Sequence, residues 1–168
     1  MTNFIFFWKE TENPYGVFSQ WAISKFEVNG KVYSCAEQYM MAEKARLFND
    51  TEIENKIMSE ITPKQFKYLG RKVKNFNQEV WDKNVYDIVV KGNYEKFKQN
   101  KYLLNILKST QSKILVEASP YDKIWGIGMK ADDFRAKDPR HWNGQNLLGK
   151  ALMDVRNEFS SNLTEEFQ

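Results

Sequence analysis

The sequence predicts an α+β fold that is mostly helical and forms a single domain with a small antiparallel sheet. Its 168 residues are enough for one domain with a sizeable hydrophobic core. Apolar residues recur at helical spacing through most of the chain. Short aromatic and β-branched runs are few, at residues 4–8, around the Asn29-Gly30 pair and near residue 115. The pattern therefore favours several helices and few strands.

The strands are expected at three places. Residues 4–8 form an aromatic and β-branched run, and residues 114–116 form a second, buried one. Residues 26–28 and 31–33 are separated by Asn29-Gly30, a pair that favours the type I′ turn of a β-hairpin. The hairpin accounts for the predicted antiparallel sheet.

Helix starts are marked by capping signals. Ser34 followed by Glu37 has the spacing of a capping box. Thr62 followed by Gln65 repeats that spacing, with Pro63 at the first helical position. Helices are expected from Ser34 onward and over residues 50–60, 62–74, 78–99, 102–107 and 146–159.

The stretch 119–145 is expected to be a long structured loop. It holds Pro120, Pro139 and three glycines, and loops of this length in compact domains are usually functional or disordered. Its two tryptophans, Trp125 and Trp142, argue against disorder. We expect one domain over residues 1–160, followed by a polar C-terminal tail at 161–168.

Composition excludes several classes of chemistry. One cysteine and one histidine leave no disulfide framework, and they make a metal centre or a Ser-His-Asp triad improbable. We therefore expect no metal and no cofactor. No apolar run is long enough to span a membrane, and the first residues lack the pattern of a signal peptide, so a cytoplasmic protein is expected. A net charge of +3 is compatible with an anionic ligand but does not indicate nucleic-acid binding.

The helix after Ser34 carries the most informative pair of residues. Glu37 and Lys44 are seven residues apart, close to two helical turns, so their side chains share a face. That face is otherwise apolar, which points to the wall of a cleft. The alternatives are a capping role for Glu37 and, for Lys44, a stem lying on apolar surface with its amine in water.

Other candidate residues each have a simpler alternative. The glycines of Trp125-Gly126-Ile127-Gly128 would let a ligand approach the backbone, or they form an ordinary turn beside a core tryptophan. Asn146 stands where a helix N-cap would be. Arg71 could hold a phosphate with two hydrogen bonds, or it is an ordinary surface arginine.

Taken together and in order, these motifs resemble the NADAR, or YbiA-like, family of N-glycosidases from about Phe4 to Phe159. The combination is specific, although no single motif is. The matching segments are Phe-Ser at 18–19, Glu-Gln-Tyr-Met at 37–40 with Lys44, Gly-Arg at 70–71, Trp81, Trp-Gly-Ile-Gly at 125–128, Trp-Asn-Gly-Gln-Asn-Leu-Leu-Gly at 142–149 and Leu-Met-x-Val-Arg at 152–156.

The resemblance implies cleavage of the C–N bond between a phosphorylated ribose and an amine. The expected substrate is either an early riboflavin-pathway intermediate or ADP-ribose attached to the exocyclic amine of guanine in nucleic acid. The composition slightly favours ADP-ribosylated nucleic acid as the substrate. Neither the oligomeric state nor the pathway follows from the sequence.

The resemblance also implies which residues form the site. Glu37, Lys44 and Trp81 are the expected catalytic residues. The second acid is expected to be Asp122, which stands closest to the Trp-Gly-Ile-Gly motif, with Glu117 as the alternative. One departure stands out, because the family commonly has Asn where this chain has Gln20. The expected substrate-binding residues are Ser19, Gln20, Arg71, Trp125, Gly126, Gly128 and Asn146.

Two catalytic routes and two rival functions stay open at this point. A neutral Lys44 could form a Schiff base with the opened sugar while Glu37 moves protons. Alternatively, Glu37 and a second carboxylate could hydrolyse the bond directly. The rival functions are a non-catalytic module that binds ADP-ribose or a related nucleotide, and an aromatic-rich nucleic-acid binder without a sugar pocket.

Overall fold

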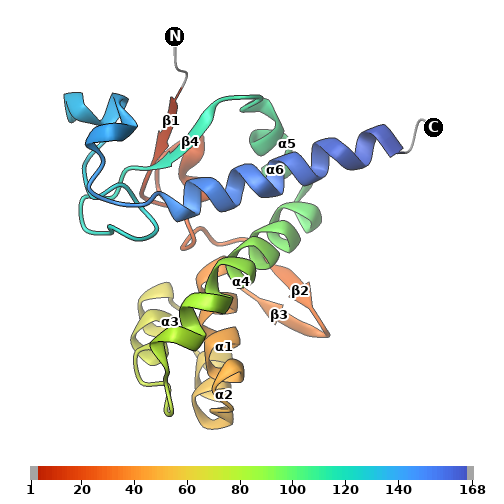
Figure 1. The fold of residues 1–168 in the computed structure, drawn as a ribbon. Helices are drawn as coiled ribbons and strands as arrows, with labels where there is room; N and C mark the ends of the chain where they lie inside the picture. Colours follow the sequence, from red (N-terminus) through yellow and green to blue (C-terminus); the bar gives the residue numbers. More distant parts are fainter. Residues whose placement is uncertain (1–3, 166–168) are drawn as a thin grey trace. The chain divides into compact units, whose positions relative to one another are not determined.

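The computed structural model describes residues 4–165, with side chains described through residue 161. The chain forms two compact units, drawn as ribbons in Figure 1. We call Gln20–Asn100 the helical unit. We call the other the strand–loop unit, and it combines the chain up to Ser19 with the chain from Lys101 onward. The prediction of a mostly helical α+β fold is confirmed.

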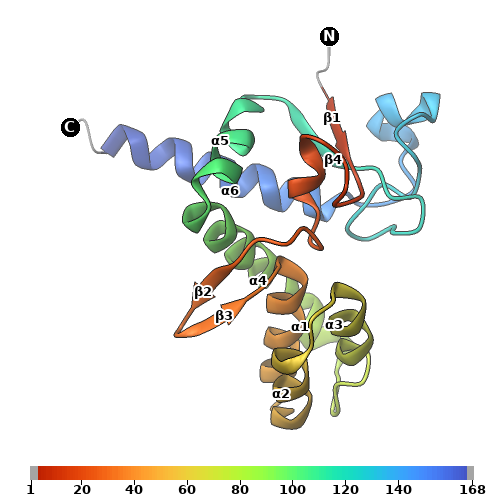
Figure 2. The same cartoon turned by 180° about the vertical axis from the view of Figure 1, so that it is seen from behind.

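The helical unit is built around one central helix. The first helix, α1, packs against the other three helices of the unit, and strand β2 packs against α4 (Figures 1 and 2). The elements are β2 at Phe26–Val28, β3 at Lys31–Tyr33, α1 at Ala36–Leu47, α2 at Thr51–Ser59, α3 at Pro63–Gly70 and α4 at Gln78–Gln99.

The predicted hairpin is confirmed. Strands β2 and β3 pair antiparallel, with Phe26 opposite Tyr33. Asn29 and Gly30, which connect them, both have a positive φ, 52° and 76°. A type I′ turn requires positive φ at both central residues, which is why the Asn-Gly pair predicted it.

Two glycines let the helices of this unit approach one another closely. A side chain at Gly92 of α4 would overlap the ring of Tyr39 on α1. A side chain at Gly70, the last residue of α3, would overlap Met41 of α1. The contact at Gly92 limits how closely α1 and α4 can lie, because protein interiors leave no room for an added methyl group against a packed ring.

The strand–loop unit pairs two strands that are far apart in the sequence. Strands β1 and β4 run parallel, with Phe4 opposite Ile114 and Phe7 opposite Glu117, and α6 packs against β4. Its elements are β1 at Phe4–Phe7, α5 at Lys101–Ser109, β4 at Ile114–Glu117, α6 at Leu147–Glu165, and short 3-10 helices at Tyr15–Phe18, Phe134–Lys137 and Pro139–His141.

The core of the strand–loop unit lies beside β4. Aromatic residues of β1 pack against a buried cluster that the long loop completes, so the loop is structured as predicted. The cluster consists of Val116, Ala118, Ile127, Met129 and Ala136.

Two helix ends differ from the prediction. Helix α3 ends at Gly70 rather than near Lys74, since the chain then turns and the backbone N–H of Lys74 donates to the carboxylate of Asp50 at 2.8 Å. Helix α6 continues past Ser160 to Glu165. Residues 166–168 of the expected tail lie outside the described residues. The expected domain at 1–160 and tail at 161–168 stay predictions.

Candidate active site

The start of α1 removes the simplest explanation for Glu37. The helix begins at Ala36, one residue later than a Ser34 cap requires, and its N-cap is Cys35, whose side chain makes no capping bond. This shift places Gln38 where Glu37 was expected. The side-chain oxygen of Gln38 accepts from the backbone N–H of Ser34 at 2.7 Å and from its hydroxyl at 3.1 Å. The predicted Ser34–Glu37 capping box is therefore wrong.

Glu37 is a buried carboxylate on the first turn of α1. Its side chain belongs to a residue only 7% exposed. Its backbone N–H donates to the carbonyl of Gln20 at 2.9 Å, which ties the segment before the hairpin to the start of the helix. Buried carboxylates are rare in proteins unless they are paired or functional. Glu37 thus keeps its place as a candidate acid.

Lys44 lies beneath two aromatic rings. Its Nζ is 4.4 Å from the centre of the Phe76 ring and 5.3 Å from that of Trp81, both distances typical of cation–π contacts. Burial lowers the pKa of the Lys44 amine, and the positive charge of Arg71 lowers it further. The charge of Glu37 acts in the opposite direction, and the net pKa is still below that of an ordinary lysine.

This electrostatic coupling supports the predicted shared face of Glu37 and Lys44. Charge effects of this kind act over short distances in partly buried sites. The sequence left open whether burial or the carboxylate of Glu37 would have the larger effect on the pKa of Lys44. Burial dominates, and a lysine with a lowered pKa is the form that chemistry at an amine requires.

Phe76 is a site residue that the sequence reasoning missed. It lies in the segment between α3 and α4, just after Asn75, whose φ of 56° turns the chain. Its ring packs edge-on against Phe48 with 5.3 Å between centroids, and it covers Lys44. The available signal was a single aromatic residue in the polar run Lys-Asn-Phe-Asn at 74–77.

Trp81 and Arg71 flank Lys44 from neighbouring elements. Trp81 is on the first turn of α4, a helix capped by Asn77, whose side-chain oxygen accepts from the backbone N–H of Val80 at 3.0 Å. Arg71 follows α3 and is exposed to solvent. The structure thus brings together two of the predicted catalytic residues, Lys44 and Trp81, with the predicted phosphate-binding arginine nearby.

Gln20 is held between α1 and α4. Its side-chain oxygen accepts from Nδ2 of Asn93 at 2.8 Å, and its Nε2 lies 3.9 Å from the sulfur of Met40. Asn93 is fully buried, and its Oδ1 has no hydrogen-bond partner among the described residues. Asn93 was not singled out from the sequence. The pair places two amide groups in the helical unit that also carries Lys44.

The remaining predicted site residues belong to the strand–loop unit, where several have structural roles. Asn146 bonds to β4 with both ends of its amide: its Oδ1 accepts from the N–H of Glu117, and its Nδ2 donates to the carbonyl of Leu115, each at 2.9 Å. The simple N-cap explanation is therefore wrong in its chemistry, because this side chain joins the start of α6 to a strand.

Asp122 organises the long loop. Its Oδ1 accepts from the backbone N–H groups of Ile124 and Trp125, both at 2.8 Å. Its carbonyl accepts from Gly128 at 3.0 Å. This pattern is an Asx turn, in which an aspartate side chain caps the following backbone. Glu117, the other candidate acid, accepts from Ile127 through its carbonyl at 2.9 Å.

The loop glycines are explained by backbone packing. A side chain at Gly126 would lie 3.0 Å from the carbonyl oxygens of both Asp122 and Glu117. Gly128 has a φ of +67°, which residues with a side chain adopt at a cost. Trp125 is half-buried and Ser19 is buried in the same unit. Contacts of these residues with a substrate stay predictions.

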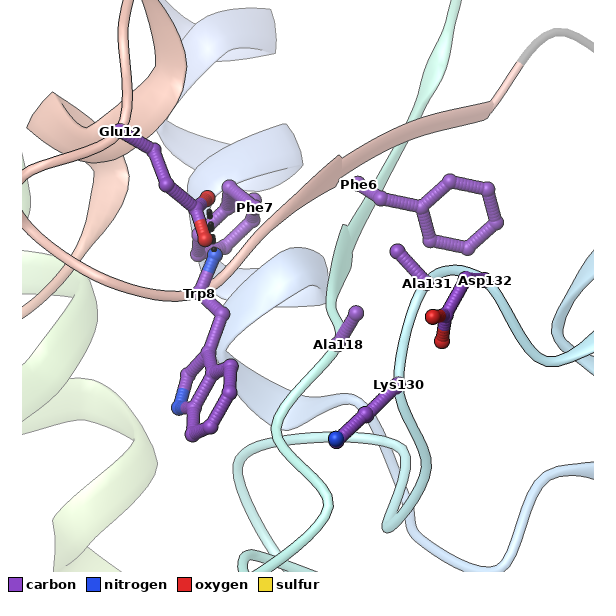
Figure 3. Close-up of a pocket in the computed structure, with 8 residues that line it drawn as sticks. All are labelled: Phe6, Phe7, Trp8, Glu12, Ala118, Lys130, Ala131 and Asp132. Carbon is purple, nitrogen blue, oxygen red and sulfur yellow. Dashed lines mark hydrogen bonds between the residues drawn. The ribbon is translucent and has the colours of Figure 1, made fainter.

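The strand–loop unit also contains a pocket of about 280 Å³ that the sequence did not indicate. It opens beyond the ends of β1 and β4, and Figure 3 shows the backbone N–H of Trp8 bonded to Glu12 at its edge. It contains none of the predicted site residues. The lining residues are Phe6, Phe7, Trp8, Glu12, Ala118, Lys130, Ala131 and Asp132.

Two features are absent from the described residues, a cluster of metal ligands and a membrane-spanning helix. No three or more His, Cys, Asp or Glu side chains among them are grouped so that they could hold a metal ion. No helix within the described chain has the length and apolar character that a membrane crossing needs.

Comparisons with known proteins identify the class. The NMR structure of Escherichia coli YbiA matches the fold with a TM-score of 0.81 at 27% identity, over 98% of this chain and 89% of that one. N-glycosidase R617 of Acanthamoeba polyphaga mimivirus is 48% identical over 162 residues, 92% of this chain and 95% of the relative. Relatives of this kind place the chain among the hydrolases that act on N-glycosyl bonds.

The family follows from a match along nearly the whole chain. A family model described as the NADAR domain matches residues 6–160, and the chain belongs to the NADAR family. The chain is also 31% identical to the maize riboflavin biosynthesis protein PYRR, a chloroplastic protein. That match covers 94% of this chain but 25% of the maize protein.

Proposed function

We propose that this hydrolase cleaves the C–N bond between a ribose 5-phosphate type of sugar, either phosphoribose or ADP-ribose, and the exocyclic amine of a heterocycle. The observation that carries the proposal is the environment of Lys44. Burial and Arg71 lower its pKa even though Glu37, a buried acid of the same helix, acts in the opposite direction. An amine with a lowered pKa that interacts electrostatically with an acid suits chemistry at a sugar carbon.

The proposed reaction starts from the open form of the sugar. The lone pair of the exocyclic nitrogen expels the ring oxygen, which takes a proton, and a protonated imine forms at the anomeric carbon. The neutral amine of Lys44 then adds to that carbon. A proton moves from the lysine nitrogen to the exocyclic nitrogen, and Glu37 is placed to carry it.

The C–N bond to the heterocycle then breaks, and the electron pair leaves with the exocyclic nitrogen. The heterocycle departs as a neutral amine, and the sugar stays bound to Lys44 as a Schiff base. Water adds to that C=N bond, and collapse of the adduct releases the free sugar and restores the lysine. No oxidant, reductant or metal enters this sequence.

The neighbouring side chains take supporting roles in the proposal. Trp81 covers the heterocycle, and Arg71 holds the phosphate through two parallel hydrogen bonds. Gln20 and Ser19 contact the sugar, and the longer Gln20 side chain shifts a contact that the family's usual Asn would make. Gly126, Gly128 and Asn146 shape the loop that carries Trp125.

Direct hydrolysis is the competing route. Glu37 would then act with a second carboxylate as an acid–base pair on an oxocarbenium-like transition state, and Lys44 would bind phosphate. Asp122 already accepts two backbone hydrogen bonds, which makes its carboxylate a weaker candidate than that of Glu117. The lowered pKa of Lys44 favours the Schiff-base route, because a phosphate ligand gains nothing from it.

The choice between the two substrates needs turnover measurements side by side. The name of the maize relative, riboflavin biosynthesis protein PYRR, supports a riboflavin-pathway intermediate. The exposed basic residues next to the site, described below, support ADP-ribose on a nucleic acid. The two substrates share the ribosylated exocyclic amine, so the same chemistry serves both.

The test is release of the sugar from a synthetic N-ribosyl amine of each kind, followed by chromatography. We expect Glu37→Gln and Lys44→Met to lose about a hundredfold or more in kcat, the usual size of acid–base and nucleophilic contributions. Glu79→Gln, on an exposed residue of α4, is the matched control and should keep its rate. Wild-type protein that binds either substrate without releasing product would contradict the proposal.

A further inference from the structure

Positive charge is concentrated in one short stretch of the helical unit. Residues 61–78 contain five basic residues and no acidic residue, in a chain whose 25 basic residues are nearly balanced by 22 acidic ones. The stretch covers α3 and the segment that leads to α4. The five are Lys64, Lys67, Arg71, Lys72 and Lys74.

Helix geometry gathers these charges on one face. Lys64, Lys67, Tyr68 and Arg71 are spaced by three or four residues, so they lie above one another along the helix direction. All four are exposed, whereas the opposite face of α3 buries Phe66 against its neighbours. We call Lys64, Lys67, Tyr68, Arg71 and Lys72 the basic face.

Among the described residues, no acidic side chain forms an ion pair with the basic face. Lys74 pairs with Glu52 at 2.9 Å, but no ion pair joins Lys64, Lys67, Arg71 or Lys72 to any acid in the described part of the chain. Surface lysines elsewhere in this unit, such as Lys56 and Lys83, pair with a glutamate one helical turn away.

An exposed aromatic ring lies among these charges. Tyr68 is 57% exposed, and the Nζ of Lys72 is 4.2 Å from the centre of its ring. Basic side chains interleaved with an accessible aromatic ring are the usual means of holding single-stranded nucleic acid, in which bases stack on rings and cations follow the phosphates.

The basic face leads to the candidate active site. Arg71 lies at its end and is close enough to Lys44 to lower the pKa of that amine. From Lys64 to Arg71 the rise is about 10 Å at 1.5 Å per residue. A strand stacked as in a duplex advances about 3.4 Å per nucleotide, so this distance spans up to about three phosphates.

We propose that the basic face binds the sugar–phosphate backbone of a single-stranded nucleic acid and presents a ribosylated base of that strand to Lys44. The inference rests on the proposed function and adds a substrate-binding surface to it. A lone phosphosugar would need Arg71 alone. The outlying lysines and Tyr68 add contacts that a longer polyanion would use.

The test is the fluorescence anisotropy of an unmodified, labelled single-stranded oligonucleotide, measured with the full chain over a series of salt concentrations. Lys64→Gln combined with Lys67→Gln should weaken binding and reduce the slope of log K against log salt by about 1.4, or 0.7 for each lost phosphate contact. Lys101→Gln combined with Lys150→Gln, at exposed lysines of the strand–loop unit, is the matched control and should leave the slope unchanged.

Tyr68 supplies a second arm of the test. Tyr68→Ala should weaken binding about fivefold or more without changing the salt slope, because stacking carries no counterion release. Tyr68→Phe keeps the ring and should restore the affinity. Circular dichroism of each variant verifies that the helices are intact.

Three outcomes would overturn the inference. They are equal losses in the control pair, no measurable binding of the oligonucleotide by the wild-type chain, and preferential binding of phosphatidylserine vesicles over the oligonucleotide. Because binding is measured on an unmodified strand, the result is readable even if the chain shows no turnover. Turnover of a mononucleotide substrate by the wild-type chain tests the proposed function independently of the basic face, because so short a substrate does not reach the outlying lysines.

Discussion

Two lysines of the helical unit have lowered pKa values, and their surroundings separate their roles. Lys44 is half-buried beneath Phe76 and Trp81, so solvent can reach it. Lys96 is fully buried on α4, where burial lowers the pKa of its amine to about 7 against a smaller opposing effect of Cys35. Only Lys44 combines a lowered pKa with access.

The buried Lys96 makes the stability of the protein depend on pH. Its amine has a pKa of about 7 in the folded chain and near 10.5 when unfolded, so between those values the unfolded chain binds the extra proton. Stability therefore rises with pH across this window, by at most about 1.4 kcal/mol per pH unit from this group. Below pH 7 the amine is charged in both states, and burial of that charge destabilises the folded chain by its full amount.

Replacement of this lysine removes that dependence. Between pH 7.5 and 9.0, the free energy of unfolding of wild-type protein should rise relative to that of Lys96→Met by up to about 2 kcal/mol. Urea unfolding at the two pH values measures it. Lys91→Met, at an exposed position of the same helix, is the control and should follow the wild type. Identical pH dependence in Lys96→Met and wild-type protein would contradict the assignment.

At the scale of residues, the sequence predicted where side chains lie better than it predicted their pKa values. The seven-residue spacing of Glu37 and Lys44 was enough to place both on one helix face, and their charges do interact. The sign of the pKa shift of Lys44 could not be predicted. It depends on Phe76 and Arg71, which reach the lysine from outside α1.

At the scale of elements, the accuracy of each predicted helix start depended on which polar side chain caps the helix. Thr62 and Gln65 form the predicted capping box at the start of α3. At α1 the same pattern of residues led to a wrong prediction. The side chain of Gln38, and not that of Glu37, accepts from the backbone N–H of Ser34. Sequence spacing alone cannot separate two acceptors that are adjacent in the chain.

Asn146 provides a quantitative test of how α6 is attached to β4. Asn146→Gly should destabilise the protein by about 2 kcal/mol or more, because two buried backbone groups lose their partners. Glycine accepts the φ of 54° at this position, so the loss isolates the hydrogen bonds from backbone strain. Chemical denaturation followed by circular dichroism measures the change.

Asn49→Gly is the matched control for that experiment. Asn49 has a similar φ of 56° but is exposed, so its replacement should change stability by a few tenths of a kcal/mol at most. Equal effects at the two positions would show that backbone conformation, and not the bonds to β4, explains the asparagine.

At the scale of the whole molecule, the pairing of β1 with β4 was the feature least accessible from the sequence. Both strands were expected as short runs, but nothing in them indicated that Phe4 would lie opposite Ile114 in a parallel pair. Parallel pairing needs a long crossover, and the one here contains the entire helical unit. Local patterns do not determine such long-range pairing.

The family, in contrast, was predictable at this scale. Individual motifs such as Trp-Gly-Ile-Gly had local explanations, and the structure gives one in the backbone packing around Gly126. Their order along the chain was specific, and the family match over residues 6–160 confirms it. The order of the motifs does not show the role of each residue. A motif includes residues that take part in the chemistry and residues that only hold the structure.

The account as a whole depends on Lys44 acting as the nucleophile, and borohydride trapping measures this most directly. Wild-type protein that turns over an N-ribosyl substrate is treated with sodium borohydride during the reaction, digested and mapped by mass spectrometry. We predict one reduced sugar adduct on the peptide that contains Lys44, and none in Lys44→Met. Full turnover without an adduct, or an adduct on another lysine such as Lys96, would contradict the account.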